Sequence, residues 1–314
     1  MDKHLHNNDW YLIINPAASN GKVKKKWSEI KKLFLDNNIE FEYAFSEYPM
    51  HALEIVDNAV KKGHRNFIGI GGDGTNNEVI NGLLKQKEVP SYELLYTLFP
   101  IGTANDWIKT HGIPEKPKKW FEAMTKASIQ PHDVGLVLFE QNEMMISRFF
   151  INVAGLAYDA FVLKTAKKEE VTWDTKWAYF MGMVRYLFKF KPRPIRLKVG
   201  EKQTEEVYFA INIGICKYSG GGMQLVPHAQ PNNGKLALMT AHDISPFNII
   251  FNFPKLYGGR VKDHNKVLLE DTTNIFVDAA ENTPPTYIEV DGELIGQAPA
   301  EFSVQEKALR ILVP

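Results

Sequence analysis

The fold of this chain is decided at residues 67–80, which read FIGIGGDGTNNEVI. The stretch opens with a short apolar run at 67–70, typical of a buried strand, and leads into apolar residues at helical spacing over 79–84. Glycines and Asp73 lie between the two. Glycine lets the backbone approach a phosphate closely, and a helix N-terminus supplies free N–H groups that bind anions. The stretch therefore predicts a strand, a phosphate-binding turn and a helix.

The alternation of strand and helix continues on both sides of this stretch. Apolar runs at 10–14, 39–45 and 94–99 predict further strands, and periodic patterns at 23–34 and 52–60 predict helices. A β-α-β-α-β-α-β order indicates a parallel sheet with helices on its faces. Ligands of such sheets bind at the carboxyl ends of the strands.

The pattern changes after Pro131, where short strand-like runs dominate up to residue 313. Turn signals such as Asp291-Gly292 separate them. We predict an α/β N-terminal domain with a parallel sheet at residues 1–131. A mostly antiparallel β-sandwich C-terminal domain is expected at 132–304, and the segment 305–314 can return to the first domain. One helical insert, at 177–190, is expected to interrupt the sandwich.

Composition excludes several classes of protein. The 314 residues contain 37 Lys and Arg against 37 Asp and Glu, so no overall field would attract nucleic acid. A single cysteine, Cys216, excludes an internal disulfide and a cysteine-based zinc site. No signal peptide and no apolar stretch of the length of a membrane span occurs in the sequence. We expect a cytoplasmic protein, soluble or peripheral to the inner face of the membrane.

Helix-cap spacing occurs twice among the candidate loops. Thr75 and Glu78 predict a capping box at the helix of the first stretch, and Thr103 with Asp106 repeats that spacing if a helix begins at Thr103. Alone, the second pair is a plain helix cap. Two such loops at the same edge of one sheet favour a nucleotide site.

Two further loops carry polar residues. Residues 15–22 link the first strand to the first helix, and alone they indicate only a connecting loop. Residues 289–293, EVDGE, place carboxylates around a glycine, which alone indicates a hairpin turn.

Together these segments resemble the diacylglycerol kinase catalytic-domain family, which includes bacterial lipid kinases and sphingosine and ceramide kinases. The resemblance rests on Asn15-Pro16 and residues 71–82, 102–106 and 290–293, which occur in the family's order across nearly the whole chain. It implies a nucleotide domain followed by a β-rich lipid domain.

The resemblance also implies ATP and Mg²⁺ as cofactors. The residues that would contact the nucleotide are Asn15, Ser46, Gly71, Gly72, Gly74, Thr75 and Thr103. Asp73, Asp106 and Glu293 would organise magnesium through water. The reaction implied is transfer of the γ-phosphoryl group to a lipid hydroxyl, with diacylglycerol as first choice of acceptor and phosphatidic acid as product.

Asp291 and Glu293 are the implied catalytic pair. Asp291 would accept the proton of the lipid hydroxyl. Because Glu293 lies two residues further on, a continued strand would point both carboxylates to one face.

Two alternatives remain open. NAD kinases share the Gly-Gly-Asp-Gly loop and a similar two-domain plan, and a non-catalytic nucleotide- or lipid-binding relative is the other. The four carboxylates of Asp73, Asp106, Asp291 and Glu293 favour an enzyme, because a binding protein needs no general base.

A lipid acceptor would be met at a membrane surface. Aromatic and basic residues crowd the segment from Trp173 to Arg193, which suits either an interfacial helix or a core helix with solvated lysines. The expected partners are the lipid substrate and the membrane surface. Nucleic acid is not expected, and a homodimer is compatible with the sequence.

Overall fold

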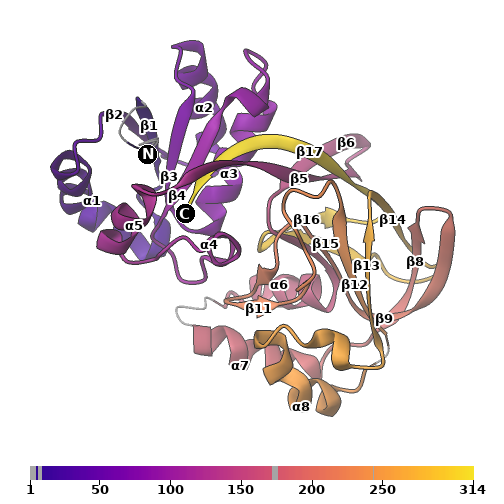
Figure 1. Ribbon diagram of the computed structural model, residues 1–314. Helices are drawn as coiled ribbons and strands as arrows, with labels where there is room; N and C mark the ends of the chain where they lie inside the picture. Colours follow the sequence, from indigo (N-terminus) through magenta and orange to yellow (C-terminus); the bar gives the residue numbers. More distant parts are fainter. Residues whose placement is uncertain (1–4, 6–8, 172–175, 243) are drawn as a thin grey trace. The chain divides into compact units, whose positions relative to one another are not determined.

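The computed structural model describes residues 5, 9–171, 176–242 and 244–314, which form two compact units (Figure 1). Unit 1 comprises residues 1–132 and 307–314, and unit 2 comprises residues 133–306. Two long strands, β5 (Ser128–Gln141) and β17 (Ala300–Val313), continue from one unit into the other.

Unit 1 is built on a parallel sheet. Its strands lie in the order β2-β1-β3-β4, and the end of β17 extends the sheet beside β4, where Arg310 pairs with Leu95. The strands are β1 (Trp10–Ile14), β2 (Phe41–Phe45), β3 (Asn66–Gly71) and β4 (Leu95–Pro100). All carboxyl ends therefore lie at one edge.

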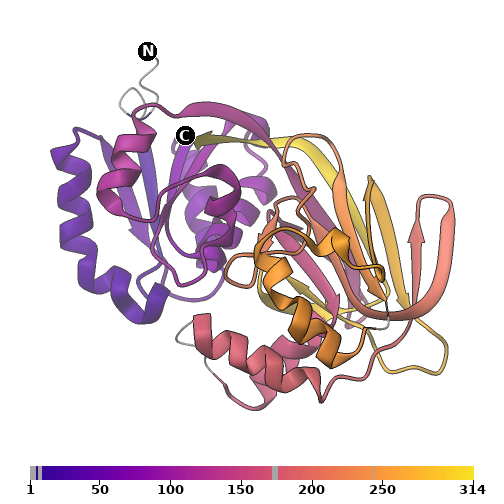
Figure 2. The same ribbon diagram turned by 60° about the horizontal axis from the view of Figure 1, so that its bottom comes forward.

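Helices cover this sheet, as the turned view in Figure 2 also shows. They are α1 (Ala18–Asp36), α2 (His51–Lys61), α3 (Asp73–Lys85), α4 (Asp106–His111), α5 (Pro117–Met124) and the short η1 (Ser91–Glu93). Phe34 of α1 is fully buried, and its ring lies 5.5 Å from that of Phe99 and 5.1 Å from that of Phe121. These aromatic contacts hold α1 and α5 against β4.

Unit 2 is mainly antiparallel. β9 pairs with β7, β8 and β12, β14 pairs with β8 and β17, and β15 pairs with β7 and β16. Its remaining strands are β6 (Met144–Phe150), β7 (Val153–Ala157), β8 (Arg193–Val199), β9 (Lys202–Gly214), β10 (Tyr218–Ser219), β11 (Met223–Gln224), β12 (Leu236–His242), β13 (Val267–Thr272), β14 (Asn274–Ala279), β15 (Tyr287–Val290) and β16 (Glu293–Gln297). A parallel sheet followed by an antiparallel β-rich domain confirms the predicted fold class.

The helices of unit 2 differ from the prediction of a single insert. Besides α7 (Lys176–Leu187), the unit contains α6 (Tyr158–Lys168), α8 (Pro246–Tyr257) and the short η2 (Val261–Asp263). The sequence hides α6 because it follows β7 without a turn signal. α8 is rich in Phe and Ile and contains Pro254, features more typical of strands and loops.

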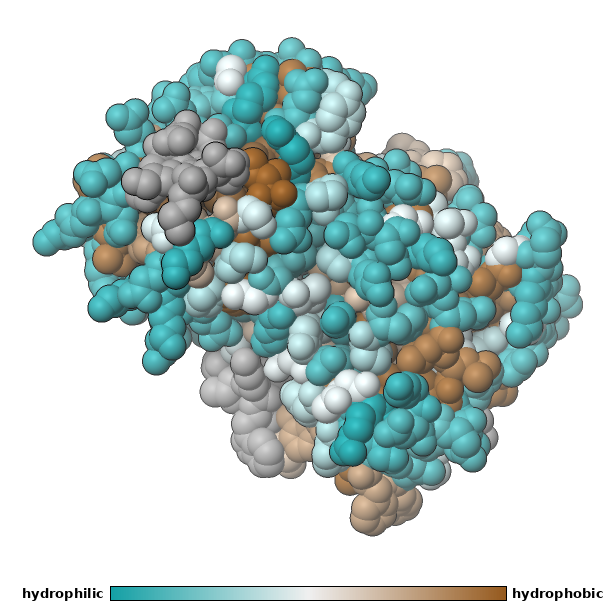
Figure 3. Space-filling model, viewed as in Figure 1, coloured by the Kyte–Doolittle hydropathy of each residue, from teal (hydrophilic) through white to brown (hydrophobic). Residues whose placement is uncertain are grey.

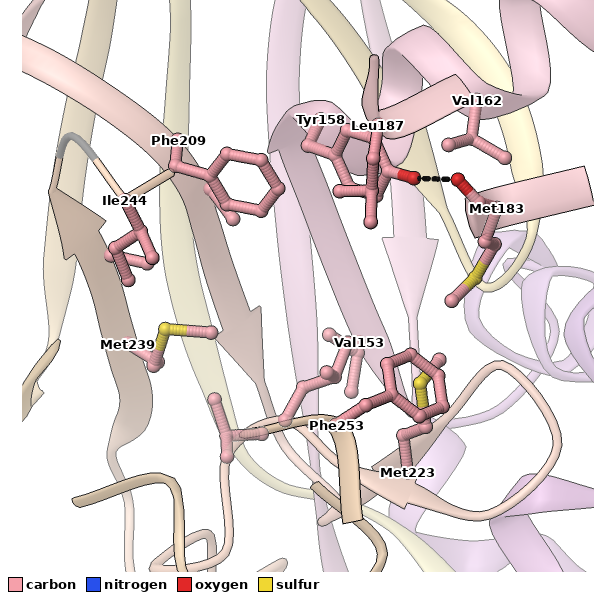
Figure 4. Packing of buried hydrophobic residues seen from close by; sticks show 14 of the residues in the cluster. Val153, Tyr158, Val162, Met183, Leu187, Phe209, Met223, Met239, Ile244 and Phe253 are labelled. Carbon is pink, nitrogen blue, oxygen red and sulfur yellow. Dashed lines mark hydrogen bonds between the residues drawn. The ribbon is translucent and has the colours of Figure 1, made fainter. Parts of the chain in front are cut away.

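A hydrophobic cluster joins these three helices to the sheet of unit 2 (Figure 4). Tyr158 of α6, Met183 and Leu187 of α7 and Phe253 of α8 pack toward Phe209 of β9. The segment predicted as an interfacial or core helix therefore has buried residues, while its Met181 and Phe188 are exposed. Trp173 lies outside the described residues.

No helix among the described residues is long and apolar enough to cross a membrane.

Neighbouring residues of α1 test the packing of unit 1. Phe34→Ala should lower the free energy of unfolding by about 3–5 kcal/mol, because it removes a fully buried ring. Leu35→Ala is the control: Leu35 is 56% exposed, and we expect a change within about 0.5 kcal/mol. Urea unfolding followed by tryptophan fluorescence measures both. Equal effects would contradict the described orientation of α1.

Candidate functional site

The glycine-rich turn between β3 and α3 is the centre of the candidate site in unit 1. β3 ends at Gly71, and α3 begins at Asp73 with Gly72 as its N-cap and no side-chain cap. The predicted capping box is therefore wrong, since Thr75 already lies in the first turn of the helix. A Cβ atom at Gly71 would lie 2.2 Å from Oγ1 of Thr75, so only glycine fits there.

Asp73 joins this turn to the loop after β4. Its carboxylate accepts hydrogen bonds from the backbone N–H of Asp106, at 2.9 Å and 3.0 Å to the two oxygens, and of Trp107 at 3.3 Å. Helix α4 therefore begins at Asp106 and not at Thr103, which is exposed in the preceding loop. An acidic side chain bonded to the free N–H groups of a helix start is a favourable arrangement.

The two loops also approach each other through glycine. The N–H of Ile101 donates to the carbonyl of Gly71 at 2.7 Å. A Cβ atom on Gly102 would lie 2.9 Å from Cα of Gly72, so a larger residue at 102 would push the loops apart. Backbone of both loops is thereby held at the carboxyl edge of the sheet.

Two carboxylates face each other in this site. Burial, and then the charge of Asp106, raises the pKa of Asp73 to about 6. Lys109 offsets part of this repulsion, because its Nζ lies 2.5 Å from Oδ1 of Asp106. The same Nζ donates to the carbonyl of Ala104 at 2.6 Å. Neither Lys109 nor this pairing was predicted from the sequence.

Asn105 is a further residue that the sequence analysis did not assign. It is buried, adopts the left-handed conformation with φ of 49°, and its Oδ1 has no hydrogen-bond partner among the described residues. Together with the carboxylates of Asp73 and Asp106, the amide oxygen of Asn105 forms a group of oxygen atoms that could coordinate a metal ion. Mg²⁺ prefers oxygen ligands and keeps several waters, so these residues fit a water-mediated magnesium ion.

The remaining predicted nucleotide residues lie at the same sheet edge. Asn15 follows β1, and its Nδ2 donates to Oγ1 of Thr75 at 3.1 Å. Ser46 follows β2, and its N–H donates to the carbonyl of Ile14 at 2.8 Å. Gly74 lies in the first turn of α3, and a Cβ atom there would meet no atom within 4 Å. The structure therefore brings the residues predicted from four separate loops to one edge of unit 1.

Asp291 lies in a tight turn of unit 2. It has φ of 48° and Gly292 has φ of 86°, the conformation of a two-residue hairpin between β15 and β16. The carboxylate accepts hydrogen bonds from the N–H groups of Ile151, Asn152 and Val153 at 3.0–3.1 Å. These three donors fix its direction.

Glu293 does not continue a strand from Asp291, because the turn lies between them. The prediction that both carboxylates point to one face on this ground is therefore wrong. Oε2 of Glu293 accepts a hydrogen bond from Nη2 of Arg148 at 2.6 Å. In this ion pair the side chain of Glu293 is 44% exposed and that of Arg148 is 11% exposed.

Two more acidic residues, Glu289 and Asp159, lie beneath this turn and were not assigned from the sequence. Glu289 is buried, and its Oε2 accepts the N–H of Gly292 at 3.0 Å. Burial first, and then the charge of Asp159, raises the pKa of Glu289 well above its ordinary value. The side chains of Glu289 and Asp159 both pack over Gly155, where a Cβ atom would lie 2.5 Å from Oε1 of Glu289.

Asp159 also lines an apolar cavity of about 110 Å³ in unit 2. The walls come from α7, α8, β9 and β12, with Phe209, Met239 and Phe253 among the apolar residues. Figure 4 shows these three side chains around one space. Asn212 lines the cavity too, and its Nδ2 donates to Oδ2 of Asp159. Burial raises the pKa of Asp159 to about 6, and the Asn212 bond partly counteracts it.

Comparison with known families agrees with both halves of this description. Residues 9–137 match the model of the diacylglycerol kinase catalytic domain. Residues 152–313, more than half of the chain, match the YegS C-terminal NAD kinase beta sandwich-like domain. The chain belongs to the diacylglycerol kinase family of lipid kinases.

This lipid kinase family member is similar to its relatives over most of their length. The chain is 25% identical over 268 residues to the diacylglycerol kinase of Mycobacterium tuberculosis, covering 84% of this chain and 81% of the relative. It is 23% identical over 311 residues to that of Bacillus subtilis, covering 96% and 95%. A crystal structure of a diacylglycerol kinase from Bacillus anthracis has a TM-score of 0.72 at 18% identity, covering 98% and 97%, and shows the shared fold.

Asp73→Asn tests the magnesium assignment in this lipid kinase family member. Magnesium added with a non-hydrolysable ATP analogue should raise the Tm of the parent protein, because a cation relieves the repulsion between Asp73 and Asp106. The magnesium-dependent part of the rise should be lost in Asp73→Asn and kept in the control Asp57→Asn, which alters a partly exposed residue of α2. An unchanged magnesium response in Asp73→Asn would exclude this residue from the metal site.

A second prediction concerns Asp159 and pH. The pKa of Asp159 is about 6 in the folded protein against an ordinary value of 3.8, so the folded state binds the proton more tightly. Ionisation of buried Asp159 therefore lowers the free energy of unfolding. This effect is absent below about pH 4 and complete above about pH 6. Urea unfolding between these limits should show that Asp159→Asn gains stability relative to the parent as pH rises. A difference that does not vary with pH would contradict the assignment.

Proposed function

We propose that this protein is an ATP- and magnesium-dependent lipid kinase whose acceptor is diacylglycerol and whose product is phosphatidic acid. The observation that carries the proposal is the apolar cavity of unit 2, with Asp159 and Asn212 as polar groups in its wall. Apolar walls suit acyl chains, and a few placed polar groups can orient a hydroxyl. A cavity of this kind does not suit a charged dinucleotide.

The proposal assigns ATP to the sheet edge of unit 1. Gly71, Gly72 and Gly74 are the proposed backbone contacts of the phosphates at the start of α3, and Thr75 lies in the same turn. Asn15, Ser46 and Thr103 are the further nucleotide contacts. These residues bind and position the nucleotide, which is most of what phosphoryl transfer requires from a protein.

Asp73 and Asp106 would hold magnesium, with Asn105 as an added oxygen donor. Glu293 stays in the proposal as a third carboxylate, and its pairing with Arg148 implies that it is already oriented. When bound, the ion neutralises charge on the phosphate oxygens. Lys109 holds Asp106 in place until then.

Asp291 is the proposed general base. The lipid hydroxyl oxygen forms a bond to the γ-phosphorus, the bond to the β–γ bridging oxygen breaks, and ADP leaves. The proton of the hydroxyl passes to the Asp291 carboxylate, a contribution typically of about 10²–10⁴ in rate. Its three backbone N–H donors aim the carboxylate, and Glu289 holds the adjoining turn through Gly292.

A panel of acceptors tests this function. The purified protein would receive γ-labelled ATP, magnesium and, separately, diacylglycerol, monoacylglycerol, a sphingoid base and NAD⁺, and the products would be separated by chromatography. We expect label in phosphatidic acid. Label in NADP⁺ would favour the NAD kinase alternative, and label in none would favour a binding protein.

Asp291→Asn is the matched variant in this assay. It should bind ATP with near-normal affinity and lose at least about 100-fold of its turnover on lipid. The control Asp271→Asn alters a partly exposed carboxylate of β13 and should behave as the parent. Turnover of Asp291→Asn close to the parent value would place the base elsewhere.

A further inference from the structure

The loop that joins β2 to α2 carries an exposed aromatic ring at the carboxyl edge of the parallel sheet in unit 1. Tyr48 is 48% exposed and lies two residues after Ser46, one of the proposed nucleotide contacts. β2 is the outer strand of the order β2-β1-β3-β4, and its carboxyl end lies at the same edge as those of β1 and β3 (Figure 1). The ring therefore lies where a bound nucleotide can reach it.

A tight turn places the Tyr48 ring against the ring of His51. The carbonyl of Tyr48 accepts the N–H of His51 at 3.2 Å, and between them lie Pro49 and Met50, whose φ is 66° and ψ is 6°. Proline at the second position and a left-handed residue at the third are features of a type II turn. Such a turn brings its first and fourth residues together. Here the two rings stack, with centroids 4.3 Å apart and planes at 10°.

Hydrogen bonds hold both rings of this stack. Oη of Tyr48 donates to Oε1 of Glu54 at 2.8 Å, and Nδ1 of His51 accepts the N–H of Glu47 at 3.1 Å. Because His51 covers one face of the Tyr48 ring, the exposed area lies mainly on the opposite face. A ring that is ordered before the ligand arrives loses little conformational freedom on binding, so this open face is suited to stacking.

The neighbours of the ring decide which kind of group can stack on it. The exposed carboxylates of Glu47 and Glu54 lie beside it and would repel a phosphate. A nucleobase is flat, aromatic and neutral, and the hydroxyls of its ribose can donate to carboxylates. Figure 3 shows a mainly hydrophilic surface for the visible part of unit 1, with scattered apolar residues, which suits a polar ligand better than an acyl chain.

The width of the sheet also favours a nucleobase at this loop. The phosphates are assigned to the turn between β3 and α3, and β2 lies two strands from β3, about 10 Å at the usual strand spacing. A nucleoside bridges a gap of this size. On the other side of β3 lies Asp106, a carboxylate assigned to magnesium. The base therefore extends the other way, past Asn15 and Ser46, toward Tyr48.

We propose that Tyr48 is the platform on which the adenine ring of ATP stacks, and that it makes the site prefer purine to pyrimidine nucleotides. A purine covers more of the phenol ring than a pyrimidine does, so the contact selects by stacked area. The inference rests on the proposed function in one respect, which is the assignment of the ATP phosphates to unit 1.

Calorimetric titration with ADP and with inorganic pyrophosphate, each with magnesium, tests the platform. Tyr48→Leu keeps an apolar side chain beside His51 and removes the aromatic face, so it should weaken ADP binding at least about fivefold. Pyrophosphate has no base, and its affinity should not change. The parent should bind ADP more tightly than UDP, and Tyr48→Leu should bring these two affinities together. Tyr48→Phe keeps the face and should keep the preference for ADP.

Tyr92→Leu is the matched control, because Tyr92 is 58% exposed but lies in η1, which precedes β4 at the amino edge of the sheet. It should bind ADP and pyrophosphate as the parent does. If Tyr48→Leu bound ADP as tightly as the parent, the platform would be overturned. Equal losses of ADP and pyrophosphate binding would also overturn it, because they would assign Tyr48 a structural role in the loop.

Photolabelling of the parent with 2-azido-ADP tests the same contact without a variant. Mass spectrometry should find the label in the peptide that contains residues 46–51, and label confined to other peptides would overturn the inference. Both experiments omit lipid, so they do not depend on the acceptor. A parent protein that bound no ADP would overturn this inference together with the proposed use of ATP, whereas ADP binding that is indifferent to Tyr48 would overturn this inference alone.

Discussion

The hydrogen bonds from the N–H groups of Asp106 and Trp107 to the carboxylate of Asp73 are the constraint on which the candidate site of unit 1 depends. They join the loop after β3 to the loop after β4, and the close approach of Gly72 and Gly102 is part of the same arrangement. They also keep an acidic group where burial and Asp106 oppose its ionisation. The candidate site of unit 1 is therefore held by its backbone.

In unit 2, as in unit 1, backbone N–H groups hold acidic side chains in place. Three backbone N–H groups hold Asp291, and one holds Glu289, so main-chain donors position each of these carboxylates. Gly155 makes room for Glu289 and Asp159 beneath the turn. A continuous set of acidic groups thus leads from Asp159 in the cavity wall to the proposed base. Its burial is costly for folding, which is typical of functional sites.

Sequence reasoning succeeded where residue type and spacing fix local structure. The glycine-rich stretch predicted a strand, a turn and a helix because few other residues permit that backbone, and the apolar runs predicted both halves of the fold. It failed where a contact depends on residues distant in the chain. Asn105, Asp159 and Glu289 can be recognised only through their burial and their partners in the folded protein. Thr75 and Thr103 were predicted to cap helices, but Asp73 is the residue that accepts the N–H groups at the start of α4. Propensity concealed α8, because packing against the cavity outweighs its strand-like composition.

The central claim is that the γ-phosphoryl group of ATP is transferred to the hydroxyl of a diacylglycerol. The most direct measurement uses ATP with ¹⁸O at the three non-bridging γ-oxygens, diacylglycerol in detergent micelles, and mass spectrometry of the lipid product. The account predicts magnesium-dependent formation of phosphatidic acid that carries all three labelled oxygens, since the fourth oxygen on phosphorus comes from the lipid. Labelled inorganic phosphate with unchanged diacylglycerol would contradict it.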